Sequence, residues 1–227
     1  MVETRRAFHE ELEELDRDVV RMAALAAEAI QAGSAALLDF DLAGADKVIA
    51  DDKVIDDLAH AMEEHVLLLL ARQQPMATDL RTLVSILRVI HELERVGDLM
   101  RNVAKATRRL YPTELEPKLR GIIARMRDQA TAQMRLAADA FADRDVHRAA
   151  ALRDMDDVMD DLQKELFRYV LGSSSHDEAA VQRAVQTALV GRHFERIADH
   201  TVNLGERVCF MVTGHFAHEA DDDEDDT

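Results

Sequence analysis

Four pairs of acidic residues are the part of this sequence best suited to chemistry. Each pair has its members four positions apart: Asp52/Asp56, Glu94/Asp98, Asp156/Asp160 and Glu195/Asp199. On an α-helix, such residues lie on one face, about 6 Å apart along the axis. Carboxylate oxygens are the ligands that Mg²⁺, Ca²⁺, Mn²⁺ and iron take in proteins. Because like charges at this spacing repel, we expect a cation or a partner to compensate them.

Two of these pairs lie in segments that repeat one another. Residues 94–102 and 195–203 both read E-R-aliphatic-small-D-x-x-x-N, at a shift of 101 positions. The apolar positions of residues 15–37 match those of 119–141 at a shift of 104, so a three-residue deletion separates the two registers. Matches of this kind indicate one structural unit that occurs twice.

The elements that carry the pairs are expected to be long helices. Apolar residues recur at spacings of three and four, Gly and Pro number only 8 and 3, and aromatic residues make up 4%. This composition favours an all-α protein with short turns. We expect helices up to residue 38, from 42 to 72 and from 76 to 110. The predicted domains are a three-helix bundle over 1–112, a second over 113–215 and a disordered acidic tail over 216–227.

The turns should bring the acidic pairs together within each unit. Helices joined by a short turn are antiparallel neighbours, so residues equally far from the turn lie at the same level. In the first unit the two pairs are equally far from Pro75. In the second unit they are equally far from a point beside Asp177. Each unit is therefore predicted to gather four carboxylates.

Three outcomes are open for four neighbouring carboxylates. A metal ion binds them, or a basic neighbour (Arg95, Arg196 or Lys53) neutralises them, or the side chains diverge into solvent.

Several nearby side chains could help the carboxylates to bind a metal ion. Asn102 and Asn203 could orient a carboxylate or bind through oxygen. His91 and His60 could add a nitrogen ligand, but neither recurs in the second unit, so simple solvation is the favoured reading. His200, which points away from the acidic face, is a weaker candidate.

The charge balance and missing motifs exclude several function classes. The net charge of −17 argues against nucleic-acid binding, which needs basic patches. The N-terminus has no apolar signal segment, and the longest strongly apolar run, 66–71, is too short for a membrane span. We therefore expect a cytoplasmic protein. No P-loop, dinucleotide-binding glycine motif or nucleophile elbow is present, so the sequence gives no support for an enzyme.

Three segments carry a resemblance to a known family: Q-P-M-A-T-D-L-R at 74–81, E-L-E-R-V-G-D at 92–98 and F-E-R-I-A-D-H at 194–200. With the tandem layout, they make residues 5 to about 213 resemble the PhoU family, phosphate-transport accessory proteins of bacteria. The resemblance implies two pseudo-symmetric antiparallel three-helix bundles packed side by side, of a spectrin-repeat-like kind. It also implies multinuclear iron or other divalent metals (zinc, manganese or magnesium) on the paired D/E-x-x-x-D motifs. Its implied ligands are Asp52, Asp56, Glu94, Asp98, Asp156, Asp160, Glu195 and Asp199.

The resemblance implies a regulatory role and no catalysis. Family members regulate phosphate uptake and act as negative regulators of the phosphate-starvation response. They are thought to connect the ATPase of the phosphate ABC transporter to a membrane sensor histidine kinase. On this basis we expect a cytoplasmic adaptor that meets the membrane only through its partners. Exposed apolar positions on the long helices suggest a homodimer.

Two other functions are possible for this sequence, and one segment departs from the family pattern. A ferritin-like carboxylate-bridged di-iron oxidase would need Glu-x-x-His motifs in a four-helix core, and the nearest match is Asp57-x-x-His60. A metal-free helical scaffold would share the fold and differ only at the acidic pairs. The second unit also lacks the Gln-Pro start of the third helix and has a Ser-rich turn, so the two sites are expected to differ in geometry or occupancy.

Overall fold

Six long helices and no strand make up the part of the chain that the structure describes, residues 2–112, 115–172 and 177–215 of a computed structural model. The helices are α1 (Val2–Asp39), α2 (Leu42–Gln73), α3 (Thr78–Leu110), α4 (Pro117–Asp143), α5 (Val146–Gly172) and α6 (Glu178–Thr213).

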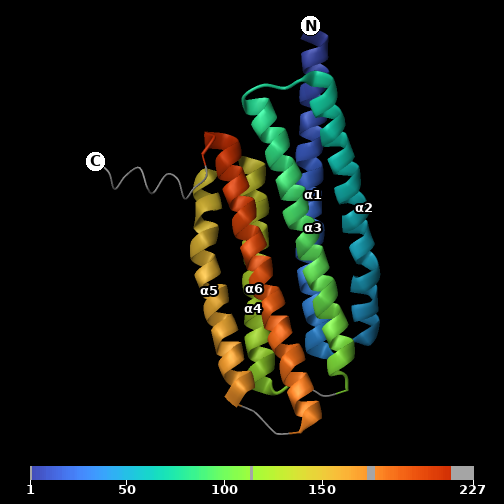
Figure 1. The fold of residues 1–227 in the computed structure, drawn as a ribbon, viewed down its shortest axis with the longest axis vertical. Coiled ribbons are helices and arrows are strands. Elements are labelled where there is room, and N and C mark those ends of the chain that lie inside the picture. The colour runs from blue at the N-terminus through green and yellow to red at the C-terminus, as the bar shows by residue number, and fades with distance from the viewer. Residues whose placement is uncertain (1, 113–114, 173–176, 216–227) are drawn as a thin grey trace, which may run out of the picture.

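The helices form two antiparallel three-helix bundles that lie side by side (Figure 1). Helices α1 to α3 form the first and α4 to α6 the second. The bundles join where α1 packs on α4 and α3 packs on α6, while α2 and α5 lie at the two outer edges. Equivalent helices run in opposite directions, so that the C-terminal part of α3 lies beside the N-terminal part of α6. The predicted all-α tandem fold is confirmed.

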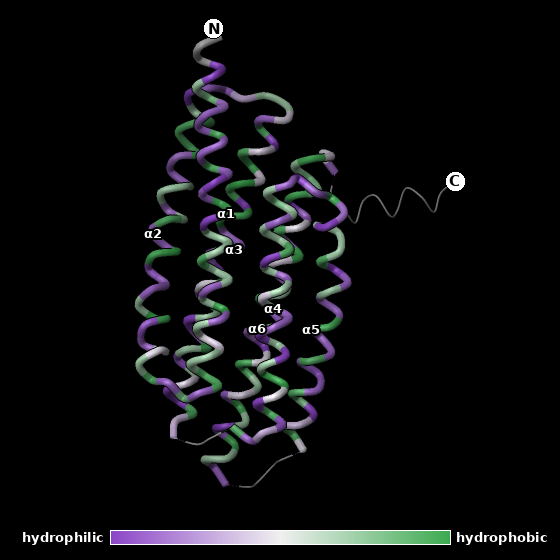
Figure 2. Tube along the Cα trace, turned by 180° about the vertical axis from the view of Figure 1, so that it is seen from behind, coloured by the Kyte–Doolittle hydropathy of each residue, from purple (hydrophilic) through white to green (hydrophobic). Residues whose placement is uncertain are grey.

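One continuous apolar core runs through both bundles. Hydrophilic and hydrophobic residues alternate along the helices, as an amphipathic helix requires (Figure 2). The apolar positions that matched between the two halves of the sequence are buried in both, for example Leu15 and Met22 in α1 and Ile123 and Met126 in α4. Burying one such side chain contributes about 1.5–3 kcal/mol. The repeat in the sequence is therefore a repeat in packing.

The ends of the helices lie close to their predicted positions. Helix α3 begins at Thr78, two residues later than expected, and α2 extends one residue further than expected. Asp177 caps α6, since its side chain accepts a hydrogen bond from the backbone N–H of Ala180 at 3.3 Å. The predicted tail, 216–227, lies outside the described residues. Among the described helices, none has a stretch long and apolar enough to cross a bilayer.

Candidate functional site

The structure brings the acidic pairs of each unit within electrostatic reach of one another. We call Asp52, Asp56, Glu94 and Asp98 the first acidic cluster, and Asp156, Asp160, Glu195 and Asp199 the second acidic cluster. The first lies where α2 packs on α3, and the second lies where α5 packs on α6. Burial and then the charges of its neighbours in the cluster, Asp56 foremost, raise the pKa of Glu94.

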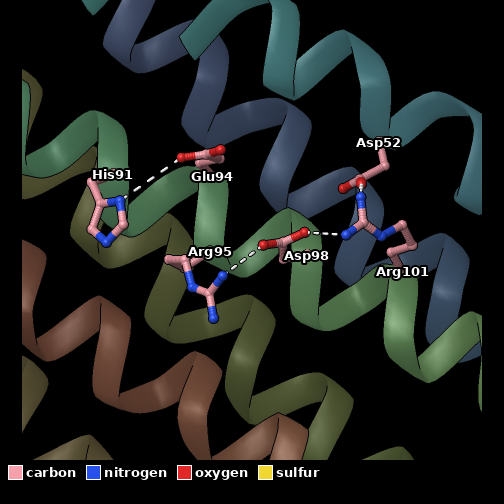
Figure 3. A network of polar contacts seen from close by, with 6 residues as sticks. All are labelled: Asp52, His91, Glu94, Arg95, Asp98 and Arg101. Carbon is pink, nitrogen blue, oxygen red and sulfur yellow. Dashed lines mark hydrogen bonds and ion pairs between the residues drawn. The ribbon is translucent and has the colours of Figure 1, made fainter. Parts of the chain in front are cut away.

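An arginine closes one end of the first acidic cluster (Figure 3). Arg101, on α3, donates from Nη1 to Asp52 on α2 and from Nη2 to Asp98 on its own helix. Arg95 donates to the second oxygen of Asp98 at 2.8 Å. At the other end, Nδ1 of His91 lies 3.8 Å from Glu94. Of the four carboxylates, only that of Asp56 has no basic partner among the described residues.

Asp52 is the most deeply placed carboxylate of the first cluster, with 5% of its surface exposed. Its Oδ1 is buried and has no hydrogen-bond partner in the described residues. Burial raises the pKa of Asp52, and the guanidinium of Arg101 opposes that rise. Gly97 permits this packing, since a Cβ there would lie 3.0 Å from Asp52 Oδ1. The close approach of α3 to α2 therefore leaves Arg101 as the group that balances a buried negative charge.

The second acidic cluster is less neutralised. Arg192 donates to Oε1 of Glu195, but Glu195 Oε2 is buried without a partner in the described chain, and Glu195 is only 8% exposed. Asp156 Oδ1 is likewise buried without a partner. The structure gives no hydrogen bond or ion pair between described residues to Asp156, Asp160 or Asp199. Three of the four carboxylates of this cluster thus lack a basic partner there.

Burial and the charges of acidic neighbours raise the pKa values of two carboxyl groups in the second acidic cluster. Burial first, and then the charges of Asp199, Asp160 and Asp157, raise the pKa of Asp156 to about 6. Burial and then the charge of Asp199 also raise the pKa of Glu195, and Arg192 only partly opposes them. A cation placed here would relieve the part of these shifts that comes from repulsion between the carboxylates.

The three basic residues considered from the sequence behave differently from one another. Arg95 neutralises Asp98, as one of the predicted outcomes required. Lys53 instead pairs with Asp57 at 2.7 Å on the exposed side of α2. Arg196 forms no ion pair within the described residues. Sequence reasoning missed Arg101, although its position three residues after Asp98 places it on the same face of α3.

Of the accessory candidates, only His91 has an ion-pair or hydrogen-bond contact with a cluster carboxylate among the described residues. His60 is exposed and lies 3.5 Å from Glu64. Asn203 donates to Glu92 at 3.3 Å, and Asn102 makes no side-chain hydrogen bond within the described residues.

Glu92 and His200 form a polar contact between the bundles that sequence reasoning did not predict. Nδ1 of His200 on α6 lies 2.6 Å from Oε2 of Glu92 on α3. Burial raises the pKa of Glu92, but the hydrogen bonds from His200 and Asn203 outweigh burial, so the net pKa lies below its usual value. Glu92 is therefore a charged residue at the α3–α6 boundary, and His200 is one of its hydrogen-bond partners there.

No group of three or more His, Cys, Asp or Glu side chains converges as a metal-holding set in the described ranges. Binding would therefore require the carboxylates to turn toward a common point. The all-oxygen donor set and the unpartnered buried oxygens of Asp156 and Glu195 fit a hard cation at the second acidic cluster. The first acidic cluster fits less well, because Arg101 already holds two of its carboxylates.

The fold and the site define a class of all-α tandem-bundle proteins with an acidic cluster in each bundle. The PhoU domain family profile matches residues 19–107 and 123–208. The chain is 39% identical over 211 residues to the phosphate-specific transport system accessory protein PhoU homolog 1 of Mycobacterium tuberculosis, covering 92% of this chain and 95% of that one. It is 33% identical over 208 residues to the PhoU homolog of Rhizobium meliloti, covering 92% and 88%.

Solved structures agree. The crystal structure of PhoU from Pseudomonas aeruginosa superposes with a TM-score of 0.86 at 29% identity, covering 92% of this chain and 100% of that one. The phosphate transport system regulatory protein PhoU from Streptococcus pneumoniae gives 0.84 at 27% identity, covering 92% and 99%. The chain belongs to the PhoU family.

Proposed function

We propose that this protein is a non-enzymatic accessory protein of a phosphate-specific transport system that regulates phosphate uptake. The observation that carries the proposal is the similarity along nearly the whole chain to proteins named for that role, at 39% identity over 92% of this sequence. Both bundles take part in the match, so the regulatory surface of such a protein would be present as a whole.

The finer proposal is an adaptor role, between the ATPase of the phosphate ABC transporter and a sensor histidine kinase, that represses the phosphate-starvation response from the cytoplasm. Exposed apolar side chains support a protein-binding role. Val181, Val185 and Leu189 follow one another at intervals of four along α6, and each is exposed over roughly half of its surface. Leu80 and Val84 occupy a comparable position on α3. Such faces suit contact with a partner or with a second copy in a homodimer.

The proposal includes divalent or iron cations at the acidic clusters. The residues that would hold them are the carboxylates of each cluster, which supply oxygen ligands suited to iron, manganese, magnesium or zinc. A bound cation would supply positive charge between two helices whose facing carboxylates otherwise repel. The chain's own contribution is to hold these carboxylates at the α2–α3 and α5–α6 contacts.

Complementation tests the regulatory role. In a bacterium that lacks its own PhoU protein, a phosphate-starvation reporter stays active in high phosphate if the missing protein is a repressor. Expression of this chain is expected to silence the reporter and to limit phosphate uptake. An active reporter and unrestricted uptake, in cells where the folded protein accumulates, would overturn the proposal. Co-purification with the transporter ATPase and the sensor kinase tests the adaptor role separately.

The ferritin-like alternative places its ligands in the core of a four-helix bundle. Here each cluster instead lies between two helices of a three-helix bundle. Oxygen consumption after the addition of ferrous iron separates the two functions, because catalytic turnover would support the oxidase. Unchanged complementation by variants that have lost the carboxylates would support the metal-free scaffold.

A further inference from the structure

We infer that the two acidic clusters have different roles: the second binds a divalent cation, whereas Arg101 closes the first by serving as its built-in cation. This inference rests on the proposed cation binding and adds to it which cluster takes the ion. It rests on residues next to the D/E-x-x-x-D motifs, because the two motifs themselves are alike.

Arg101 satisfies in the first acidic cluster the charge that a metal ion would satisfy. Its two terminal nitrogens donate to Asp52 on α2 and to Asp98 on α3 (Figure 3). A bridge between carboxylates of neighbouring helices is also what a bound cation would provide. An arginine keeps its proton at any physiological pH, so this charge cannot be removed by deprotonation.

Displacing Arg101 from the first acidic cluster would be costly. Asp52 is 5% exposed, and its remaining oxygen already lacks a partner in the described chain. If a divalent ion entered, the guanidinium would have to leave its buried partner or remain beside a like charge. Both alternatives oppose binding.

The second acidic cluster has no equivalent of Arg101. The shift of 101 positions that relates the two motifs places Val202 at the corresponding site, and valine carries neither charge nor a polar atom. Asp156, Asp160 and Asp199 consequently have no basic partner among the described residues. Arg101 balances negative charge in the first acidic cluster, and no described residue balances the corresponding charge in the second acidic cluster.

Arg192 does not replace Arg101. It contacts Glu195 from three residues earlier on the same helix, and its side chain is half exposed. It therefore engages one end of the cluster and does not bridge α5 to α6. Oε2 of Glu195 stays buried and unpartnered within the described residues, in a side chain whose neighbours in the cluster are acidic.

Manganese binding to the full-length protein tests the inference. Equilibrium dialysis with Mn²⁺, read by electron paramagnetic resonance, is applied to the wild type, Asp98→Asn and Asp199→Asn. These matched variants remove one charge from the equivalent position of each cluster. We expect Asp199→Asn to weaken Mn²⁺ binding by about tenfold or more, and Asp98→Asn to leave it near the wild-type value.

Exchanging the residue types at the two corresponding positions, 101 and 202, supplies the second arm of the test. Val202→Arg is expected to weaken binding at the second cluster by about tenfold or more, since it adds a competing cation. Arg101→Val is expected to create a further Mn²⁺ site that the double variant Arg101→Val/Asp98→Asn lacks. Circular dichroism checks that each variant is folded, and Val202→Arg keeps the test decisive if Arg101→Val unfolds.

The outcomes separate this inference from the proposed function. Equal losses in Asp98→Asn and Asp199→Asn, or unchanged binding in Val202→Arg, would overturn the division of roles and leave cation binding itself intact. No Mn²⁺ binding by any folded variant would overturn both this inference and the cation part of the proposed function. The reporter assay on the wild type would still decide the regulatory role independently.

Discussion

Nδ1 of His200 lies 2.6 Å from Oε2 of Glu92 and thereby joins α6 to α3 across the boundary between the two bundles. Glu92 is 9% exposed, and Asn203 donates to the same oxygen. A buried carboxylate thus has two partly buried hydrogen-bond partners on the neighbouring bundle. Because a buried carboxylate is costly unless it is hydrogen-bonded, the contact makes the relative placement of the bundles depend on specific partners.

Replacing His200 should therefore destabilise the protein more than replacing an exposed histidine. His200→Ala leaves Glu92 with Asn203 as its remaining partner, and we expect the free energy of unfolding to fall by about 1–3 kcal/mol. Urea unfolding followed by circular dichroism measures this change. The control is His60→Ala, whose exposed side chain lies 3.5 Å from Glu64 and whose loss should change stability by less than about 0.5 kcal/mol. Equal effects of the two substitutions would contradict an anchoring role for His200.

Arg101 and Lys53 offer a second contrast, between a buried bridge and an exposed ion pair. Arg101→Ala leaves the buried carboxylate of Asp52 without a basic partner, so a loss of about 2 kcal/mol or more is expected. Lys53→Ala breaks a pair with Asp57 in which both side chains are largely exposed, so a change of about 0.5 kcal/mol or less is expected. Thermal unfolding of the metal-free proteins compares them. A loss in Arg101→Ala no larger than that in Lys53→Ala would show that Arg101 does not balance Asp52.

The raised pKa of Asp156 predicts that the stability of the metal-free protein depends on pH. Its pKa is raised to about 6 in the folded state, against about 3.9 for an unfolded aspartate. Between these two values the folded state binds more protons than the unfolded state, so this group adds stability as the pH is lowered from 7 toward 4. Asp156→Asn should thus be more stable than the wild type at pH 7.5, and the difference should shrink by pH 4.5.

The control for Asp156 lies on the exposed side of the same helix. Asp161 pairs with Lys164 at 3.1 Å, and its side chain is 79% exposed. Asp161→Asn should change the free energy of unfolding by less than about 0.5 kcal/mol at pH 7.5 and at pH 4.5, as exposed substitutions usually do. A pH-independent difference for Asp156→Asn as well would show that burial and the acidic neighbours do not perturb its carboxyl group.

The sequence predicted the helices and the gathering of carboxylates because both follow from periodicity. Buried apolar side chains recur at helical spacing, and the antiparallel turn sets the level at which the acidic pairs face each other. It did not predict that Arg101 reaches Asp52, because two basic residues near Asp98 could equally have pointed into solvent. The Glu92–His200 contact could not be predicted either. It depends on how α3 packs on α6, and no local sequence pattern encodes that packing.

Alanine substitutions at Gly205 and Gly121 test how tightly α5 and α6 are held together in the second bundle. A Cβ added at Gly205 on α6 would lie 2.7 Å from the backbone oxygen of Ala149 on α5, and the backbone cannot give way as a flexible side chain would. Gly205→Ala should therefore cost about 1–3 kcal/mol of stability, as overpacking typically does. At Gly121 on α4 no atom lies within 4 Å of the added Cβ, so Gly121→Ala should stabilise the protein by about 0.5–1 kcal/mol through helix propensity alone. Because both positions lie inside helices, propensity favours alanine at each, and opposite shifts in the urea midpoint would isolate the α5–α6 contact. Stabilisation by both substitutions would mean that α5 and α6 separate readily, and the second acidic cluster between them would then not be held by packing.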